Sequence, residues 1–287
     1  MKKILIGILG LVLASALVWA AASLEIIKQP ESQTVKAGES VTFSVETSEE
    51  DVELAMSMVW CPAGTFTMGS PSGEVGRDSD ETQHSVTISH GFWIGKYEVT
   101  QAQYRAVMGS NPASGYGVGD NYPVYYVSWY DAMEFCQKLT EIERAAGRLP
   151  ESYAYTLPTE AQWEYACRAG TTTAFNNGTN IPTEEQGWGA CPNLDPVAWY
   201  WYNAGTYEYT SHPVGQKKPN AWGIYDMHGN VYEWCLDWYP GYEGSYRVLR
   251  GGSWYCYACF CRSAYRDYGD PSNGSFRGFR VALSLVQ

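Results

Sequence analysis

Near its C-terminus, over residues 250–280, the chain reads RGGSWYCYACFCRSAYRDYGDPSNGSFRGFR. Between Trp254 and Phe279 this stretch has no Leu, Ile, Val or Met, and its aromatic residues are interspersed with Cys, Ser, Gly, Asp and Asn. Buried strands are built from aliphatic and β-branched side chains, whereas Tyr with small polar residues is typical of a binding surface. We therefore expect this stretch to form a binding surface, either a catalytic pocket or a recognition face.

The composition of the 287-residue chain is that of a globular protein with an aromatic, weakly charged surface. Hydrophobic residues make up 45% of it, and 12 Trp and 23 Tyr accompany a charged fraction of only 17%. A chain of this length can form one large or two modest domains with a core of their own. The formal net charge of −12 argues against nucleic acid or anionic lipid as the main partner, so we expect no nucleic-acid binding.

The N-terminus has the organisation of a secretory signal peptide, which we assign to residues 1–22. Two lysines follow Met1, an apolar run covers residues 4–18, and three alanines end the segment as a cleavage site. We expect export to the cell surface, the periplasm or the extracellular space. The alternative is an uncleaved anchor, but the apolar run is short for a span, and we expect no membrane insertion of the mature chain.

The chain contains eight cysteines, but their spacing is not that of a disulfide framework. Three of them, Cys256, Cys259 and Cys261, crowd into one short segment. Cys136 and Cys167 fall on the apolar faces of predicted helices, so we expect these two to be free thiols in the core.

We expect residues 23–57 to be a short spacer, whose β-pattern resembles the start of an immunoglobulin-like module. The main domain covers residues 58–287. It opens with an alternating stretch around a turn, residues 60–70, which we expect to be a β-hairpin. Further strands are expected at residues 85–88 and 92–99.

Three capping boxes mark the starts of three helices. They are, in chain order, Thr100 with Gln103, Ser128 with Asp131, and Thr159 with Gln162. We expect the first helix to cover residues 101–108 and to stop at Gly109, and the third to end at Gly170.

Residues 171–223 are rich in Gly, Asn, Pro, Thr and aromatic residues and show little periodicity. Loops of this length are expected to be ordered by packing or by a metal. The chain order is helices, then loops, then a strand-rich C-terminus, without alternation of strand and helix. This order predicts an α+β fold.

Several stretches resemble, in order, the motifs of the formylglycine-generating enzyme family, also called sulfatase-modifying factors. They are PAGTFTMGS at 62–70, EVTQAQY at 98–104, VSW at 127–129, LPTEAQWEYA at 157–166, GNVYEW at 229–234, RGGSW at 250–254 and GFR at 278–280. The resemblance covers residues 58–287 and implies this family's variant of the C-type lectin fold, an α+β fold with much irregular loop structure. Fold alone does not settle function.

The resemblance raises one enzymatic alternative, a copper-dependent formylglycine-generating oxidase acting on a sulfatase-type cysteine. In such oxidases two cysteines after the Gly-Gly-Ser motif hold copper, and thiolates favour Cu(I). Cys256 stands where the first would be and Cys261 keeps the spacing of the second, whereas Cys259 is out of register. This chain is also shorter than the oxidases before Arg262. Under this alternative Cys256 and Cys261 are catalytic.

A second enzymatic branch, the sulfoxide synthases, needs an iron site of histidines. The histidines of this chain lack the spacing of paired metal ligands, so we expect ordinary surface or loop residues at His84, His90, His212 and His228.

Residues 250–280 resemble a third branch more closely, the variable proteins of diversity-generating retroelements. Their C-terminal segment is rewritten by adenine-directed mutagenesis, mainly at AAC codons, and forms a ligand-binding face. Phe, Tyr, Cys, Ser, Asp, Gly and Asn are encoded by codons that differ from AAC only at its adenines. Such residues occupy what we call the variable positions, which are Tyr255, Cys256, Tyr257, Cys259, Phe260, Tyr265, Asp267, Tyr268, Gly269, Asp270, Ser272, Asn273, Gly274, Ser275 and Phe276.

The residues between them look like a fixed frame. The frame residues are Arg250, Gly251, Gly252, Ser253, Trp254, Arg262, Ser263, Arg266, Pro271, Gly278, Phe279 and Arg280. In this interpretation the cysteine cluster is a product of codon chemistry and not a metal site.

The resemblance also implies calcium. Asp226, Gly229, Val231 and Glu233 fall where the family's calcium loop has its ligands, with two carboxylates and two backbone carbonyls that suit a hard cation. We predict a calcium site there, with a carboxylate pair hydrogen-bonded to loop amides as the alternative.

These features predict an exported or surface-displayed monomer whose diversified C-terminal face binds a protein or glycan. If so, several aromatic residues at the variable positions are exposed and clustered.

Overall fold

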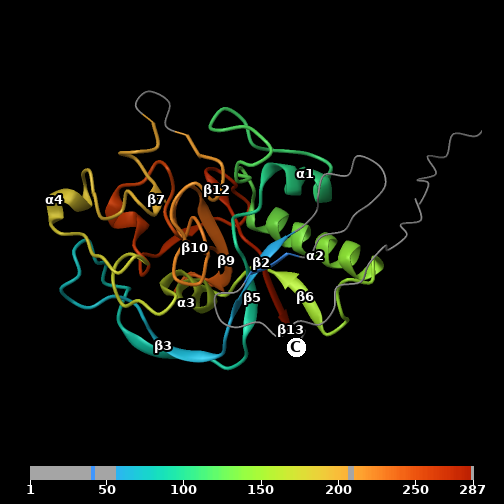
Figure 1. Cartoon of the computed structure of the whole chain (residues 1–287), viewed down its shortest axis with the longest axis horizontal. Helices are drawn as coiled ribbons and strands as arrows, with labels where there is room; N and C mark the ends of the chain where they lie inside the picture. The colour runs from blue at the N-terminus through green and yellow to red at the C-terminus, as the bar shows by residue number, and fades with distance from the viewer. Residues whose placement is uncertain (1–39, 43–55, 206–209, 286–287) are drawn as a thin grey trace, which may run out of the picture.

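The computed structural model describes residues 40–42, 56–205 and 210–285 (Figure 1). Its largest sheet has five strands in the order β1-β2-β5-β13-β6, and all neighbours are antiparallel. These strands are β1 (Ser40–Thr42), β2 (Ser57–Cys61), β5 (Phe92–Gly95), β13 (Ala282–Leu285) and β6 (Tyr153–Thr156). The last strand of the chain is therefore an inner strand, with Ala282 opposite Ile94 on one side and Thr156 on the other.

The predicted signal peptide and most of the predicted spacer lie outside the described residues. Within the predicted spacer, the described strand β1 pairs with β2, which begins at Ser57, in the register Ser40 opposite Val59.

A second sheet carries most of the C-terminal region, with four strands in the order β11-β10-β9-β12. These are β9 (Tyr232–Trp238), β10 (Arg247–Arg250), β11 (Asp267–Gly269) and β12 (Arg277–Gly278). Residues 250–280 leave the sheet after β10, pass through the 3-10 helix η1 (Ala258–Cys261), and return as its two edge strands. Two smaller pairs are β3 (Gly64–Met68) with β4 (His84–Ile88), and β7 (Ala198–Trp199) with β8 (His228–Gly229).

The three predicted capping boxes are present, with both reciprocal bonds made in each. They open α1 (Gln101–Met108), α2 (Trp129–Ala145) and α3 (Glu160–Arg168), and a short α4 (Glu184–Gly187) follows. Gly109 ends α1 at φ 77°, as predicted. α3 ends at Arg168, two residues before the predicted Gly170, because Ala169 adopts the left-handed conformation (φ 43°). Within the described ranges, no helix is both long and apolar enough to cross a membrane.

Two local predictions were wrong. Residues 60–70 are not a hairpin, because the chain changes sheet at Pro62, so that β2 pairs with β5 whereas β3 pairs with β4. The strand expected at residues 92–99 ends at Gly95. There the backbone N–H groups of Gly95 and Lys96 donate hydrogen bonds to the carbonyl oxygens of Val281 and Ser57.

Strands of the five-stranded sheet contribute to two hydrophobic clusters. On one face α1 and α2 pack, and Tyr104 and Phe135 stack at 5.7 Å between ring centroids. Trp163 and Cys167 of α3 lie in the hydrophobic cluster that contains Val59 of β2. Figure 1 shows α2 alongside β6, and α3 close to β9 and β10.

A third hydrophobic cluster orders the long loops. Phe175, Cys191, Leu194 and Tyr200 of residues 171–223 are buried together with the cysteines of η1. The loops of this region are thus held by packing. All eight cysteines are buried and free, as predicted for Cys136 and Cys167 in the core.

Three arginines of residues 250–280 are completely buried and paired with carboxylates on distant elements. Their nearest approaches are Arg250 to Glu164 at 2.5 Å, Arg262 to Glu81 at 2.6 Å and Arg280 to Glu233 at 2.6 Å. Each guanidinium also donates to backbone carbonyls. Because buried charges need both a partner and hydrogen bonds, these contacts fix where the segment runs.

Arg250→Met is expected to lower the free energy of unfolding by about 3–5 kcal/mol, because it removes the cation that Glu160 and Glu164 share in the interior. Equilibrium urea unfolding measures this loss. The matched control is Arg105→Met, which breaks an exposed pair with Asp120 and should cost less than about 1 kcal/mol. Equal losses in the two variants would contradict the assigned role of Arg250.

Candidate functional site

The predicted frame forms the floor of the candidate site. All of its residues are buried except Arg266, which is half-buried. Gly251 and Gly252 adopt φ values of 91° and 73°, in the region that favours glycine. A Cβ at Gly252 would also lie 2.7 Å from Cys261 Sγ, so the turn after β10 requires glycine for reasons of space as well.

The aromatic residues at the variable positions lie at the surface, and none of them is buried. Tyr255 is 53% exposed and Tyr268 is 42% exposed, and the partly exposed ones are Tyr257, Phe260, Tyr265 and Phe276. Three polar variable positions are exposed: Asp270, Ser272 and Asn273. Asp267, Gly274 and Ser275 are half-buried, whereas the interior contains Cys256, Cys259 and Gly269.

Ring contacts connect all of these aromatic residues except Tyr268 into one surface, which we call the aromatic face. Starting at Phe276, successive centroid distances are 5.9 Å to Tyr255, 4.7 Å on to Trp201, 5.9 Å to Tyr257, 5.8 Å to Trp188, 5.4 Å to Phe260 and 5.1 Å to Tyr265. Edge-to-face and offset contacts at such distances stabilise aromatic clusters. The segment therefore presents a continuous set of rings.

Three members of the aromatic face were not predicted, namely Trp188, Trp201 and Tyr202. Trp188 is 53% exposed and Tyr202 is 49% exposed, and each contacts Tyr257. They come from the loops at residues 171–223, close to α4 and β7 in Figure 1. The aromatic content of these loops was the available signal, but their sequence does not reveal which rings meet η1.

Tyr268 lies in a second tyrosine cluster. It stacks on Tyr242 at 5.8 Å between ring centroids and contacts Tyr239 at 4.7 Å and Tyr246 at 5.1 Å. Tyr242 is 49% exposed. The variable positions thus contribute rings to two exposed clusters, of which the aromatic face is the larger.

Cys256 lies beneath the aromatic face with its thiol hydrogen-bonded. Its Sγ is 3.3 Å from Ser253 Oγ and 3.3 Å from the hydroxyl of Tyr232. Burial raises the pKa of Cys256, and it raises that of Cys261 well above the ordinary range, so both side chains are thiols and not thiolates at neutral pH. Copper(I) at Cys256 and Cys261 stays a prediction of the oxidase alternative.

The four residues predicted to hold calcium lie together where β8 leads into β9, but their carboxylates are engaged. Both oxygens of Glu233 accept from Arg280 at 2.6 Å, and one also accepts from Trp163 Nε1 at 2.7 Å. Asp226 accepts from Gly215 N at 2.6 Å, as in the alternative of a carboxylate hydrogen-bonded to loop amides. As arranged, Glu233 does not fit a calcium ligand, and calcium here stays a prediction.

No group of three or more His, Cys, Asp or Glu side chains in the described part of the chain is arranged to hold a metal ion. Burial lowers the pKa of His228 to about 4, and His212 stacks on Trp199, whereas His84 and His90 are exposed.

A family match accounts for both the fold and the frame. Residues 44–285 match the sulfatase-modifying factor enzyme 1-like domain, and the chain belongs to this family. It is 34% identical to the chaperone protein LppX of Paenibacillus barcinonensis, over 72% of this chain and 84% of that protein. It is 28% identical to the formylglycine-generating enzyme of Mus musculus, over 78% and 74%.

Two solved structures share the fold. Treponema denticola variable protein 1 superposes with a TM-score of 0.66 and 30% identity, over 85% of this chain and 98% of that one. PvdO from Pseudomonas aeruginosa superposes with a TM-score of 0.68 and 31% identity, over 88% and 100%. The expected α+β fold of the C-type lectin type and the resemblance to variable proteins are confirmed.

Asp226→Asn is expected to stabilise the protein by about 1–3 kcal/mol at pH 7.5. Burial raises the pKa of Asp226 to about 6, so the folded state binds a proton that the unfolded state releases, and stability falls as pH rises from about 4 to about 6. Asparagine tolerates the φ of 56° at this position. Thermal unfolding at pH 4.5 and 7.5 measures the gain, which should shrink at the lower pH. A gain that is equal at both pH values would contradict this account.

Anaerobic titration with Cu(I) tests the oxidase alternative. Because the Cys256 thiol is protonated and hydrogen-bonded, wild-type protein and Cys256→Ser are expected to bind Cu(I) equally weakly. Tight binding that the Cys256→Ser variant loses would instead favour the oxidase.

Proposed function

We propose that this protein is an exported or surface-displayed ligand-binding protein whose diversified aromatic face binds a protein or glycan partner. The observation that carries the proposal is the division of residues 250–280 between an exposed aromatic set and a buried frame. Side chains at the surface can be exchanged without opening cavities in the core, whereas frame side chains cannot. Such a division suits a face whose side chains change while its backbone stays constant.

The chemistry of the aromatic face favours recognition of an uncharged surface. Trp and Tyr supply rigid, amphipathic contact area at low entropic cost and are enriched at binding hot spots. Trp188, Tyr202 and Tyr255 are the most exposed rings of this face. Sugar rings and apolar protein side chains both pack on such rings, and the hydroxyl groups of the tyrosines offer hydrogen bonds.

The likeness to Treponema denticola variable protein 1 supports a variable ligand-binding role. Family membership alone does not decide between a binding and an enzymatic function, because one relative is named a chaperone protein and another a formylglycine-generating enzyme. The buried, hydrogen-bonded thiol of Cys256 favours binding over cysteine oxidation. Export rests on the predicted signal peptide, and a monomeric state is a further part of the proposal.

The DNA beside the gene tests diversification directly. We expect a near-copy of the 3′ coding segment that carries AAC where this chain has Tyr255, Tyr257, Phe260 or Tyr268, next to a reverse transcriptase gene. Codons of the frame, such as those of Arg250, should be identical in the two copies. Differences spread equally over frame and variable codons, or no such copy in the complete genome, would overturn the proposal.

A further inference from the structure

Four rings at the aromatic face come from outside the C-terminal segment that we propose to be diversified. Three are its members Trp188, Trp201 and Tyr202, and the fourth, Tyr116, adjoins the face through an edge contact with Phe276 at 5.3 Å between ring centroids. Trp188, Tyr202 and Tyr116 are 53%, 49% and 40% exposed. These four side chains keep their identity when codons of the C-terminal segment change, so we call them the constant rings.

Backbone hydrogen bonds hold two of the constant rings in place. The N–H group of Trp201 donates to the carbonyl oxygen of Cys256 at 2.9 Å, which ties its loop to the turn after β10. The N–H group of Tyr116 donates to the hydroxyl of Tyr125 at 2.9 Å, and its carbonyl oxygen accepts from Ser211 Oγ at 2.8 Å. Rings on a backbone that is already ordered lose less conformational freedom on binding, which favours affinity.

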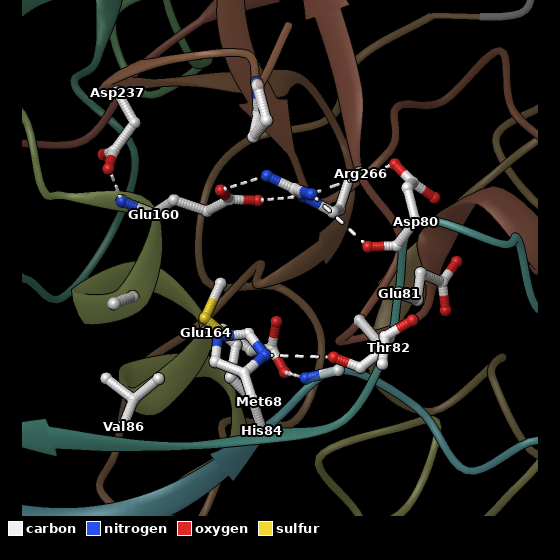
Figure 2. Close-up of a pocket in the computed structure, with 14 residues that line it drawn as sticks. Met68, Asp80, Glu81, Thr82, His84, Val86, Glu160, Glu164, Asp237 and Arg266 are labelled. Atoms are coloured by element: carbon white, nitrogen blue, oxygen red, sulfur yellow. Dashed lines mark hydrogen bonds and ion pairs between the residues drawn. The ribbon is translucent and has the colours of Figure 1, made fainter.

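The backbone beneath the variable rings is held as well. Tyr265 is followed by the frame residue Arg266, whose guanidinium pairs with both oxygens of Glu160 at 2.6 and 2.7 Å (Figure 2). The same end of α3 is held by Asp237, which accepts from the backbone N–H group of Glu160 at 2.7 Å. A bidentate pair fixes direction as well as distance. The constant and the variable rings therefore share a defined backbone when side chains are exchanged.

The chemistry of the aromatic face favours a protein over a glycan. Phe260 and Phe276 offer no hydrogen bonds, and one oxygen of Asp270 already accepts from the N–H group and the hydroxyl of Ser272, at 2.8 and 2.7 Å. A sugar pressed against such rings would bury hydroxyl groups without partners, which is unfavourable. Apolar protein side chains carry no such cost, and Trp, Tyr and Phe are enriched at the centre of protein interfaces.

Negative charge borders the face at α4. Glu184 and Glu185 of this helix are both exposed, and Trp188 follows as its C-cap, with its N–H group donating to the carbonyl oxygen of Glu184 at 3.3 Å. Interfaces combine an apolar centre with a polar rim, and the charges across that rim are complementary. A partner that meets the rim at α4 therefore presents basic side chains there.

We propose, on the basis of the proposed function, that the constant rings contact every ligand of the aromatic face, and that these ligands are proteins with an apolar patch bordered by basic side chains. The constant rings supply affinity that all ligands share, because desolvated Trp and Tyr side chains dominate binding energy. The variable rings select among such proteins, since specificity is a difference of affinities. Mutation of the variable codons therefore changes which protein binds, while the shared contact is kept.

Selection from a displayed library of the full chain tests the class of ligand. The library carries adenine-directed codons at Tyr255, Tyr257, Phe260 and Phe276. It is selected against cytochrome c and ribonuclease A, two unrelated basic proteins, and against biotinylated chitohexaose. We expect binders to both proteins, with different variable residues, and none to the glycan. Binders to chitohexaose alone would contradict a protein partner, and a library without binders to any probe would contradict the proposed function as well.

Trp188→Ala and Tyr202→Ala are each expected to weaken every selected binder by about tenfold or more toward its own target protein. The matched control is Tyr130→Ala, which removes an equally exposed ring (53%) on α2 outside the aromatic face and should leave the affinity unchanged. Thermal unfolding checks that the variants are folded, and Tyr202→Ala alone suffices if Trp188→Ala unfolds. Binders that keep their affinity without these rings would overturn this inference, while the proposed function would stand.

The double variant Glu184→Gln/Glu185→Gln tests the basic border of the ligand. It should bind both basic targets more weakly than the parent at low salt, and the difference should vanish at high salt, where surface charges are screened. Equal affinity of the double variant and its parent at low salt would contradict the basic border.

Discussion

The fold depends on three arginines of the C-terminal segment, whose guanidinium groups pair with buried carboxylates on other parts of the chain. Arg250 reaches α3, Arg262 reaches Glu81, and Arg280 reaches Glu233 on β9. A buried charge without its partner is strongly unfavourable, so each pair defines one position for the chain and excludes others. With the backbone held at these three points, the exposed side chains between them are not needed to fix the fold. A binding surface whose residues can be exchanged needs side chains that do not determine the fold.

Sequence reasoning succeeded where a feature is local. The capping boxes at Thr100, Ser128 and Thr159 depend on residues three positions apart, and all three helices begin where the boxes predict. It failed where pairing is set by distant strands. Residues 60–70 have the alternation of a hairpin, yet β2 pairs with β5, because alternation does not specify the partner of a strand.

The same limit applies to the candidate site. Residue types alone predicted exposed rings such as Tyr255 and Tyr268, but not the burial of Cys256, which follows from the tight turn after β10. Trp188 was missed because its contact with Phe260 joins a loop to η1 across the sequence. For Glu233 the calcium prediction rested on nearby residues, whereas its partner Arg280 is 47 positions away.

We infer that the frame determines the structure, while the exposed variable positions are free to change. This inference is tested most directly by displaying two libraries on cells, one with adenine-directed codons at Tyr255, Tyr257, Phe260 and Tyr268, the other with equivalent randomisation at Arg250, Trp254, Arg262 and Arg280. Resistance to protease measures folding in each. Most members of the first library should remain folded, and nearly all members of the second should not. Similar losses in the two libraries would contradict it.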